Sequence, residues 1–292
     1  MIISASYRTD IPAFYGPWFL NRFRAGSCRV ASPYGGPPLT VPLRDGVDGY
    51  VFWTRNARPF LPALEVVREA GLPFMLSYTV TGYPRALEAG VADTGQAAAT
   101  IRALAGRFGP RAVVWRYDPI LVTDLTPPDW HRRNFAALAA SLEGAVDTVV
   151  VSFAQIYRKT LRNLSAAARA GGFGWRDPGD GEKRQALAAL AAIAADHGIT
   201  LSVCSQPALT GGACGAARCI DLIRLSDIAG RPVPGRTKGN REGCLCGESR
   251  DIGAYDSCPQ GCAYCYAVTG RARARMRLGR HDPQGEFLMP PD

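Results

Sequence analysis

Short apolar runs rich in β-branched and aromatic residues recur along this chain of 292 residues, and amphipathic stretches separate them. Such alternation predicts an α/β fold with helices packed on a parallel sheet, because parallel strands need a crossover connection between them. The runs are almost continuously apolar, as expected for strands that are buried on both faces. The predicted strands are Ile2–Ser6, Arg29–Ser32, Tyr50–Thr54, Phe74–Val80, Ala112–Tyr117, Thr148–Phe153 and Thr200–Cys204.

The stretches between these strands carry apolar residues at every third or fourth position, which is the spacing of one helix face. Residues 97–108 form one such stripe. Two other stripes end just before Gly71 and Gly198, and a glycine directly beyond a periodic run is a helix stop signal. We therefore expect helices between most of the strands.

Seven predicted strands, with an eighth candidate near Asp221–Leu225, favour a (β/α) barrel of the TIM type over a short open sheet. An open doubly wound sheet is the alternative, because strand spacing does not determine whether a sheet closes. After about Asp221 the chain becomes rich in Gly, Arg and Cys and loses its periodicity. We therefore expect a barrel domain over residues 1–221 and a cysteine-rich C-terminal appendage, packed on the barrel, over residues 222–292.

Polar side chains follow successive predicted strands, at the ends where parallel α/β folds bind their ligands. Arginines at three of these ends could hold a carboxylate or phosphate with paired hydrogen bonds, which predicts a pocket for a small polar or anionic substrate. Each neighbouring Arg–Asp pair could equally be a structural ion pair. The candidate catalytic residues are Arg8, Asp10, Arg116 and Asp118, and the candidate cofactor-binding residues are Arg55 and Asn56.

Eight of the nine cysteines lie between Cys204 and Cys265. The odd count, and an N-terminus without the layout of a secretory signal, argue against a disulfide framework and predict a cytoplasmic protein. No apolar run approaches the roughly 18 residues that cross a bilayer, so no membrane partner is expected. Clustered thiols in a reducing compartment are typical of metal or redox sites, and three histidines are too few for a histidine-rich metal site.

Cys258, Cys262 and Cys265 place three thiolates within eight residues. Soft thiolate ligands suit iron–sulfur clusters, zinc and copper(I). Structural zinc sites usually have two paired knuckles, whereas this run is one compact loop, which favours a 4Fe-4S cluster with one iron left open. The C-terminal appendage would then be an iron–sulfur-binding segment, cross-linked by its metal.

The other cysteines allow several interpretations. Cys244 or Cys246 could supply a fourth cluster ligand, or the pair could help to bind a second metal. Cys204, Cys214 and Cys219 are either further ligands or small side chains buried in the core.

The spacing of the three clustered cysteines, with Tyr264 directly before the last, resembles the signature of radical S-adenosylmethionine enzymes. The resemblance implies that these cysteines bind the cluster and that Tyr264 shields it and approaches the adenine of S-adenosylmethionine. In that superfamily the fold is a full or partial (β/α) barrel, and reductive cleavage of the cofactor gives a radical that abstracts hydrogen. The superfamily's motif lies in an early loop, whereas here it is near the C-terminus; closure of a barrel would bring the first and last elements together.

Seven runs along the chain carry a second resemblance. They are Ser-Tyr-Arg-Thr-Asp-Ile-Pro (6–12), Val-Phe-Trp-Thr-Arg-Asn (51–56), Trp-Arg-Tyr-Asp-Pro-Ile (115–120), Val-Ser-Phe (151–153), Cys-Ile-Asp (219–221), Ser-Arg-Asp-Ile-Gly-Ala-Tyr (249–255) and Cys-Tyr-Ala (265–267). Together they resemble the bacterial domain-of-unknown-function 1848 family over nearly the whole chain. That family is noted for a C-terminal cysteine cluster like that of radical S-adenosylmethionine enzymes.

The sequence therefore predicts an iron–sulfur protein that is a redox or radical-S-adenosylmethionine-like enzyme. One alternative is a cluster that acts as Lewis acid or electron relay without S-adenosylmethionine; another is a non-catalytic binding protein stapled by its metal. An electron donor such as ferredoxin or flavodoxin would serve a redox-active cluster. The net charge of +9 suits anionic partners, but the arginines are spread along the chain, so nucleic acid is not the favoured partner. The densest arginine run, residues 271–280, is best interpreted as a solvated helix or tail.

Overall fold

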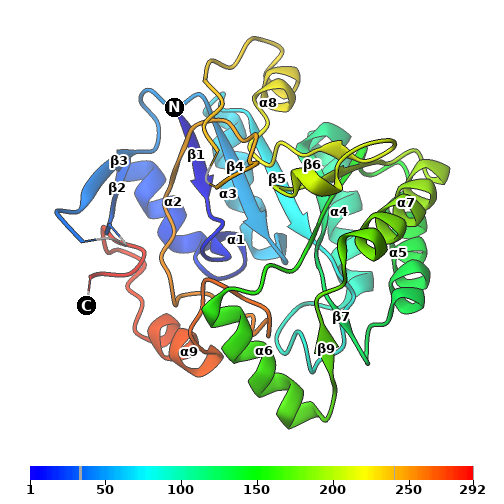
Figure 1. Ribbon diagram of the computed structural model, residues 1–292. Helices are drawn as coiled ribbons and strands as arrows, with labels where there is room; N and C mark the ends of the chain where they lie inside the picture. The colour runs from blue at the N-terminus through cyan, green and yellow to red at the C-terminus, as the bar shows by residue number, and fades with distance from the viewer. Residues whose placement is uncertain (33–34, 240, 292) are drawn as a thin grey trace.

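The computed structural model of the protein describes residues 1–32, 35–239 and 241–291, and its centre is a parallel sheet of eight strands (Figure 1). From β1 to β11, each strand lies beside the next sheet strand along the chain, while the last strand, β12, pairs with the first. In spatial order the strands are β11 (Gly215–Ala216), β10 (Thr200–Val203), β8 (Thr148–Phe153), β6 (Val113–Ile120), β5 (Phe74–Thr79), β4 (Gly49–Thr54), β1 (Ile2–Ala5) and β12 (Ser249–Asp251).

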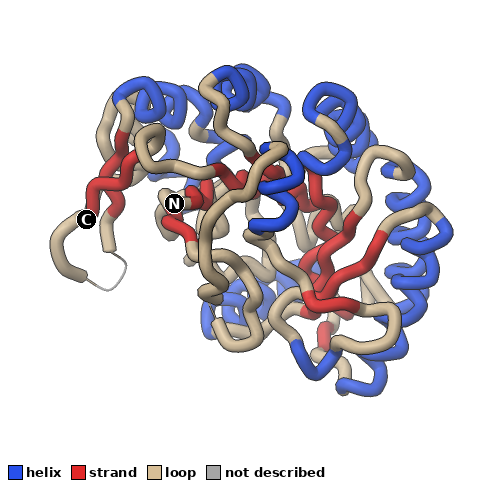
Figure 2. Tube along the Cα trace, turned by 90° about the horizontal axis from the view of Figure 1, so that it is seen from above, coloured by secondary structure: helices blue, strands red, loops and turns tan. Residues whose placement is uncertain are grey.

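Figure 2 shows from above the helices that follow most of these strands. They are α1 (Ile11–Phe14), α2 (Gly16–Ala25), α3 (Leu61–Glu69), α4 (Thr94–Phe108), α5 (Pro128–Leu142), α6 (Arg158–Gly171), α7 (Asp180–Asp196), α8 (Leu222–Ala229) and α9 (Arg271–Gly279), with short 3-10 turns at Arg58–Phe60, Pro110–Ala112 and Pro207–Leu209. Two small antiparallel sheets pair β2 (Ser27–Val30) with β3 (Leu39–Pro42) and β7 (Val122–Thr123) with β9 (Trp175–Arg176). Among the described residues, no helix combines the length and the apolar character needed to span a membrane.

The central strands bury both of their faces. On one face, side chains such as Phe52 and Leu76 pack with apolar residues of α2, α3, α4, α5 and α7. On the other face, Val51 and Met75 pack against the chain that follows β10, including Leu225 of α8. Successive strand residues point to opposite faces, so burial on both sides explains why these strands are continuously apolar in sequence.

Most of the elements predicted from the sequence are confirmed. Six predicted strands are strands of the main sheet, and the predicted helix over residues 97–108 lies within α4. The run at Arg29–Ser32 contributes to β2 instead, in a hairpin outside the main sheet. The eighth strand expected near Asp221–Leu225 is wrong. The Asp221 side chain accepts hydrogen bonds from the backbone N–H groups of Ile223 and Arg224, which caps a helix and begins α8.

The C-terminal part of the chain is built into the same core. Residues 222–292 supply β12 to the main sheet and α8 to the face that carries Val51 and Met75, which is called the inner face below. β11 and β12 are the two edges of the sheet, and the segment after β11 approaches β12, where the Gly247 N–H donates to the Ile220 carbonyl at 2.9 Å. The described residues thus form an α/β fold with a large parallel sheet.

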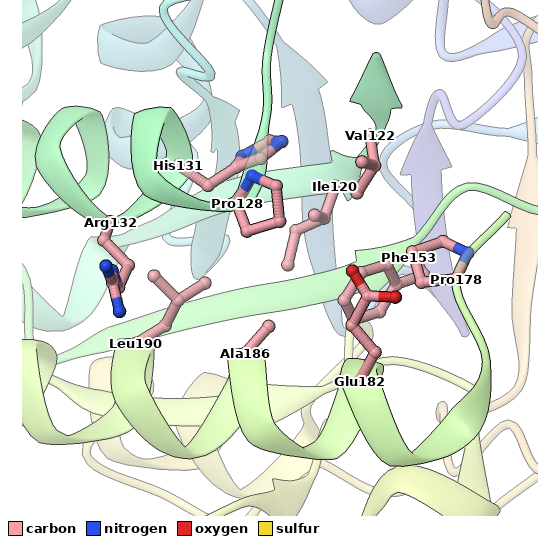
Figure 3. A pocket seen from close by; sticks show the side chains of 10 residues that line it. All are labelled: Ile120, Val122, Pro128, His131, Arg132, Phe153, Pro178, Glu182, Ala186 and Leu190. Carbon is pink, nitrogen blue, oxygen red and sulfur yellow. The ribbon is translucent and has the colours of Figure 1, made fainter. Parts of the chain in front are cut away.

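A small cleft lies between α5 and α7, next to the ends of β6 and β8 (Figure 3). Its walls are mainly apolar and include Ile120, Phe153 and Leu190. Its volume of about 20 Å³ is room for about one water molecule, so it is not a ligand site of useful size.

His131 of α5 borders this cleft and is buried as a neutral imidazole. Its Nε2–H donates to the Leu121 carbonyl at 3.0 Å, and its Nδ1 accepts from the Tyr117 hydroxyl at 2.8 Å. Burial lowers the pKa of His131 from 6.5 to about 4. The histidine therefore contributes a neutral hydrogen-bonded bridge rather than a metal ligand or a charge.

This histidine predicts a pH dependence of stability. Between pH 6.5 and pH 4 the unfolded chain binds a proton at His131 that the folded chain does not, so the free energy of unfolding falls as the pH falls through this window. The loss from this group is about 3 kcal/mol. Urea unfolding measures the free energy of unfolding at pH 7 and at pH 4. The fall in this free energy between the two pH values should be about 3 kcal/mol smaller for His131→Gln than for the wild type. Equal decreases in the two proteins would contradict the burial argument.

Candidate functional site

The cysteine run lies in the loop that follows β12, at the carboxyl end of the main sheet. Because β12 pairs with β1, this loop starts beside the first strand of the chain, as expected from the sequence if first and last elements are neighbours. The loop then crosses the strand ends. The Ala263 N–H donates to the Leu87 carbonyl at 2.8 Å, and the hydroxyl of Thr160 in α6 donates to the Tyr264 carbonyl at 3.2 Å.

Cys258, Cys262 and Cys265 lie close enough for their charges to interact with one another. Burial raises the pKa of each thiol, that of Cys262 to about 12. The free thiols are therefore protonated at neutral pH, and binding of a cation would release their protons. Backbone N–H groups of Ala267 and Val268 point at the Cys265 sulfur and lower its pKa against the effect of burial, which favours a thiolate there.

The spacing of these thiols bears on which metal they suit. In the described part of the chain, no three His, Cys, Asp or Glu side chains converge as the ligands of a single ion do. Tetrahedral zinc, with bonds of about 2.3 Å, would draw its sulfur ligands to about 3.8 Å from one another. An iron–sulfur cluster binds each thiolate through a different iron and therefore accepts ligands that lie further apart. The donor set is compatible with a cluster.

Asp10 ties the cysteine loop to the ends of β1 and β4. Its buried carboxylate accepts from the Thr54 hydroxyl at 2.7 Å and from the Arg55 N–H at 2.9 Å. It also accepts from the Ala13 N–H at 3.0 Å and from the side-chain amide of Gln260 at 2.9 Å. Both carboxylate oxygens thus hold neighbouring segments of the site together. These contacts are those of a positioning residue.

Arg55 forms a buried ion pair at the centre of the site. Its Nη1 lies 2.8 Å from Glu88 Oε1, and its Nη2 donates to the Tyr264 hydroxyl, which in turn donates to Glu88. The Thr81 hydroxyl donates to the same carboxylate at 2.5 Å. The positive charge of Arg55 also lowers the pKa of Cys262 against the effect of burial. Arg55 and Tyr264 therefore meet beside a cysteine, and Glu88, which the sequence did not single out, completes the group.

A second polar group lies near the end of β6. Arg116 pairs with Asp118, and its guanidinium lies 5.0 Å from the centre of the Trp53 ring. Asp118 also accepts a hydrogen bond from Ser152. The structural ion pair that the sequence allowed for Arg116 and Asp118 is present. Arg116 has a further partner, because its Nη1 donates to the sulfur of Cys219 at 3.1 Å.

Arg8 pairs with Asp251 rather than with Asp10. Its Nε lies 3.6 Å from Asp251 Oδ1, and its guanidinium lies over the rings of Tyr7 and Tyr255, at 5.4 and 5.3 Å from their centres. The ion pair between Arg8 and Asp10 that the sequence allowed is therefore wrong. Asp251 ends β12 and reaches Arg8 only because β12 pairs with β1.

Some buried polar atoms around the loop have no hydrogen-bond partner among the described residues. They are Arg8 Nε, Thr9 Oγ1 and Gln260 Oε1. Because buried polar atoms are nearly always bonded in folded proteins, atoms left open at strand ends are candidates for contact with a ligand. Asn56 differs from them: its side-chain oxygen accepts from the Arg58 N–H at 3.2 Å and shapes the turn after β4.

The remaining cysteines fall into two groups, and none of the nine forms a disulfide. Cys28 and Cys214 are buried in the core that packs against the helices. The four others, Cys204, Cys219, Cys246 and Cys244, lie together. The sulfur atoms of Cys204 and Cys219 are 3.3 Å apart, and further hydrogen-bonding contacts join Cys219 to Cys246 and Cys246 to Cys244.

A basic groove of about 420 Å³ lies beside the cysteine loop. It is lined by Pro259 of the loop, Phe14 of α1, and Arg271 and Arg275 of α9. The Arg271 side chain fixes α9 to the loop, because its Nε donates to the Pro259 carbonyl at 3.1 Å. The arginine run forms the helix α9 (Figure 1), one of the two forms expected from the sequence. Its arginines add positive charge next to the cysteine loop.

Comparison with known proteins gives one match. A protein-family model described as "Domain of unknown function (DUF1848)" matches residues 2–267 and so spans the main sheet, the cysteine group beside Arg116 and the cysteine loop. Neither the curated proteins nor the solved structures contain a match.

Proposed function

The chain belongs to the DUF1848 family, and from this premise we propose that it is an iron–sulfur enzyme whose cluster is bound by Cys258, Cys262 and Cys265. The enzyme would act on a small polar or anionic substrate. The observation that carries the proposal is the position of the three thiols beside the buried ion pair of Arg55 and Glu88, at the strand ends where α/β enzymes bind ligands. A metal that only stapled the loop would not need this charged network beside it.

When bound, a 4Fe-4S cluster supplies one-electron chemistry and, with three protein ligands, one open iron. The protein's part is to stabilise the thiolates. The N–H groups of Ala267 and Val268 favour the thiolate of Cys265, and the charge of Arg55 favours that of Cys262. Hydrogen bonds and charges at cluster sulfurs are also what tunes a cluster's reduction potential.

S-adenosylmethionine is the proposed cofactor for the open iron, on the resemblance of the cysteine run. Tyr264 supports this because Arg55 and Glu88 hold its hydroxyl in place beside the cysteines. Burial raises the pKa of Tyr264 well above its usual value, so the phenol stays protonated and its ring is a fixed neutral surface. The open carboxamide oxygen of Gln260 could accept a hydrogen bond from the cofactor's ammonium group.

Arg8 is the residue proposed to hold an anionic substrate. It is mostly buried, its Nε faces Asp251 at 3.6 Å without making a hydrogen bond, and the hydroxyl of the adjacent Thr9 is open as well. A carboxylate or phosphate could satisfy both. The sequence also predicts Asp10, Arg116 and Asp118 to be catalytic. Asp10 is better explained as a group that positions the cysteine loop, and the Arg116–Asp118 pair as an ion pair that orders the inner face of the sheet.

A (β/α) barrel is the proposed form of the sheet. The strands follow one another around the sheet in chain order, and the last pairs with the first, which is the topology of such a barrel. The hydrogen bond from Gly247 to Ile220 links the segment after β11 to the segment before β12, which supports closure of the sheet. In a barrel the cysteine loop would lie over the mouth, where barrel enzymes have their active sites.

An acidic electron donor such as ferredoxin or flavodoxin would suit the surface beside the cysteine loop. Arg271 and Arg275 line the groove next to Pro259, so an acidic partner attracted there would approach the cluster. Nucleic acid is a less favoured partner for this short helix. A reducing cytoplasm is the proposed location, because no cysteine of the chain forms a disulfide.

Iron analysis and electron paramagnetic resonance test the function. We expect protein purified without oxygen to contain about four iron and four sulfide per chain. The resonance of the reduced cluster should change when S-adenosylmethionine is added. Zinc without sulfide would contradict the cluster. An iron signal that ignores S-adenosylmethionine would contradict the radical mechanism and favour a Lewis-acid or electron-relay cluster.

A further inference from the structure

Four cysteines from three separate segments meet on the inner face of the sheet. Cys204 follows β10, Cys219 follows β11, and Cys244 and Cys246 precede β12. The Cys204 and Cys219 sulfur atoms are 3.3 Å apart. Cys219 also has a hydrogen-bonding contact with Cys246, and Cys246 has one with Cys244, so the four thiols form a continuous series.

Positive and polar hydrogen-bond donors point at this series of sulfurs. Arg116 donates to Cys219 at 3.1 Å, and Arg241 donates to Cys204 at 3.7 Å. The backbone N–H of Ile220 donates to Cys246 at 3.4 Å. Neutral thiols packed as small apolar groups need no such donors, whereas metal-bound thiolates are regularly held by N–H groups of this kind.

The chain around Cys244 is packed too closely for ordinary side chains. A Cβ at Gly239 would lie 2.3 Å from the Cys244 carbonyl oxygen, and a Cβ at Gly243 would lie 2.8 Å from Pro207. Gly243 also has a φ of +67°, which favours glycine. The loop is therefore shaped to bring Cys244 and Cys246 against the residues that follow β10.

From these contacts we propose that Cys204, Cys219, Cys244 and Cys246 bind one thiophilic divalent cation of the zinc type in a tetrahedral site. Zinc bonds of about 2.3 Å place four sulfurs about 3.8 Å apart, which is close to the 3.3 Å between the sulfur atoms of Cys204 and Cys219. Like the thiols of the cysteine loop, these four among the described residues do not yet converge as the ligands of a single ion do, so binding would turn Cys244 and Cys246 toward Cys204. Four thiolates on different irons of a cluster would lie further apart.

Such an ion would join the two edges of the main sheet. It would link the residues after β10 and β11 to the segment that leads into β12, where one backbone hydrogen bond from Gly247 to Ile220 is present. Through Cys219 it would also hold Arg116 over Trp53. The site is separate from the cysteine loop and does not depend on the proposed function.

Cobalt and zinc binding test this site in the full chain with Cys258→Ser and Cys262→Ser, so that the cysteine loop contributes nothing. We expect about one Co²⁺ per chain, with the intense visible bands of tetrahedral thiolate coordination, and its displacement by Zn²⁺. Adding Cys219→Ser or Cys246→Ser should weaken zinc binding by more than about 100-fold, beyond the loss typical of an outer partner. Cys28→Ala and Cys214→Ala are the matched controls and should bind normally.

Other results would overturn the proposal. They are cobalt spectra without tetrahedral thiolate bands, zinc affinity unchanged in Cys219→Ser, sulfide in the double variant, or a Cys204–Cys219 disulfide in place of metal. Cys244→Ser is a second variant for measuring zinc binding, because Cys244 is only partly buried and its replacement should leave the fold intact. Circular dichroism of each variant separates loss of the metal from loss of the fold.

Discussion

Replacing Cys262 with serine is expected to lower the iron content of protein purified without oxygen from about four atoms per chain to fewer than about one. The buried charge of Arg55 lowers the pKa of Cys262 against the effect of burial, so it stabilises the thiolate that would bind iron. Serine cannot replace it, because a hydroxyl binds iron poorly and does not ionise at neutral pH. With two thiolates left, the loop cannot retain a cluster.

Iron and sulfide assays with visible absorption measure this loss. Cys214→Ser is the matched control, because Cys214 is buried in the core beside the helices. Its variant should keep the full iron content. Iron retained in Cys262→Ser, or lost equally in both variants, would contradict the assignment of the cysteine loop as the cluster site.

Replacing Arg55 with methionine is expected to lower the free energy of unfolding by about 3–5 kcal/mol at pH 7. The side chains of Arg55 and Glu88 are 10% and 3% exposed, so removing the guanidinium leaves a carboxylate buried without its counter-ion. The Tyr264 hydroxyl would lose a partner as well. Urea unfolding with a chelator present compares both proteins without metal.

Two further variants make this test specific. Arg132→Met removes a surface pair with Asp129 whose side chains are 57% and 66% exposed, and should cost less than about 1 kcal/mol. Arg55→Met combined with Glu88→Leu should recover most of the lost stability, because no charge is then left buried. A loss below about 1 kcal/mol in Arg55→Met alone would mean that water reaches Glu88.

The strands that can be predicted from this sequence are those buried on both faces. β8 has the predicted bounds, Thr148–Phe153, because five of its six residues are buried and apolar or small. β11 and β12 have two and three residues with exposed or half-buried side chains, so they leave no apolar run. Their place in the sheet depends on pairing with distant strands, which a local pattern does not contain.

The same distinction applies to the site. The three cysteines of the loop could be found because they are close in sequence. Glu88 could not, since the loop after β5 carries no pattern that marks it. Asp251 lies in one of the runs that resemble the family, and that was its only signal. The closeness of Arg8 and Asp10 in the sequence suggested an ion pair that does not form. Arg8 pairs instead with Asp251, which the pairing of β1 with β12 brings beside it.

The pairing of the last sheet strand with the first has a consequence for how the protein is made. Asp10 meets Gln260, and β1 meets β12, across nearly the whole chain. At roughly 5–20 residues per second, a ribosome needs roughly 10 seconds or more to reach β12 after it has made β1. During that time β1 has an open edge that could pair wrongly. A chain released before residue 249 can neither cover that edge nor present the cysteine loop, so the proposed cluster could be bound only after most of the chain has been made.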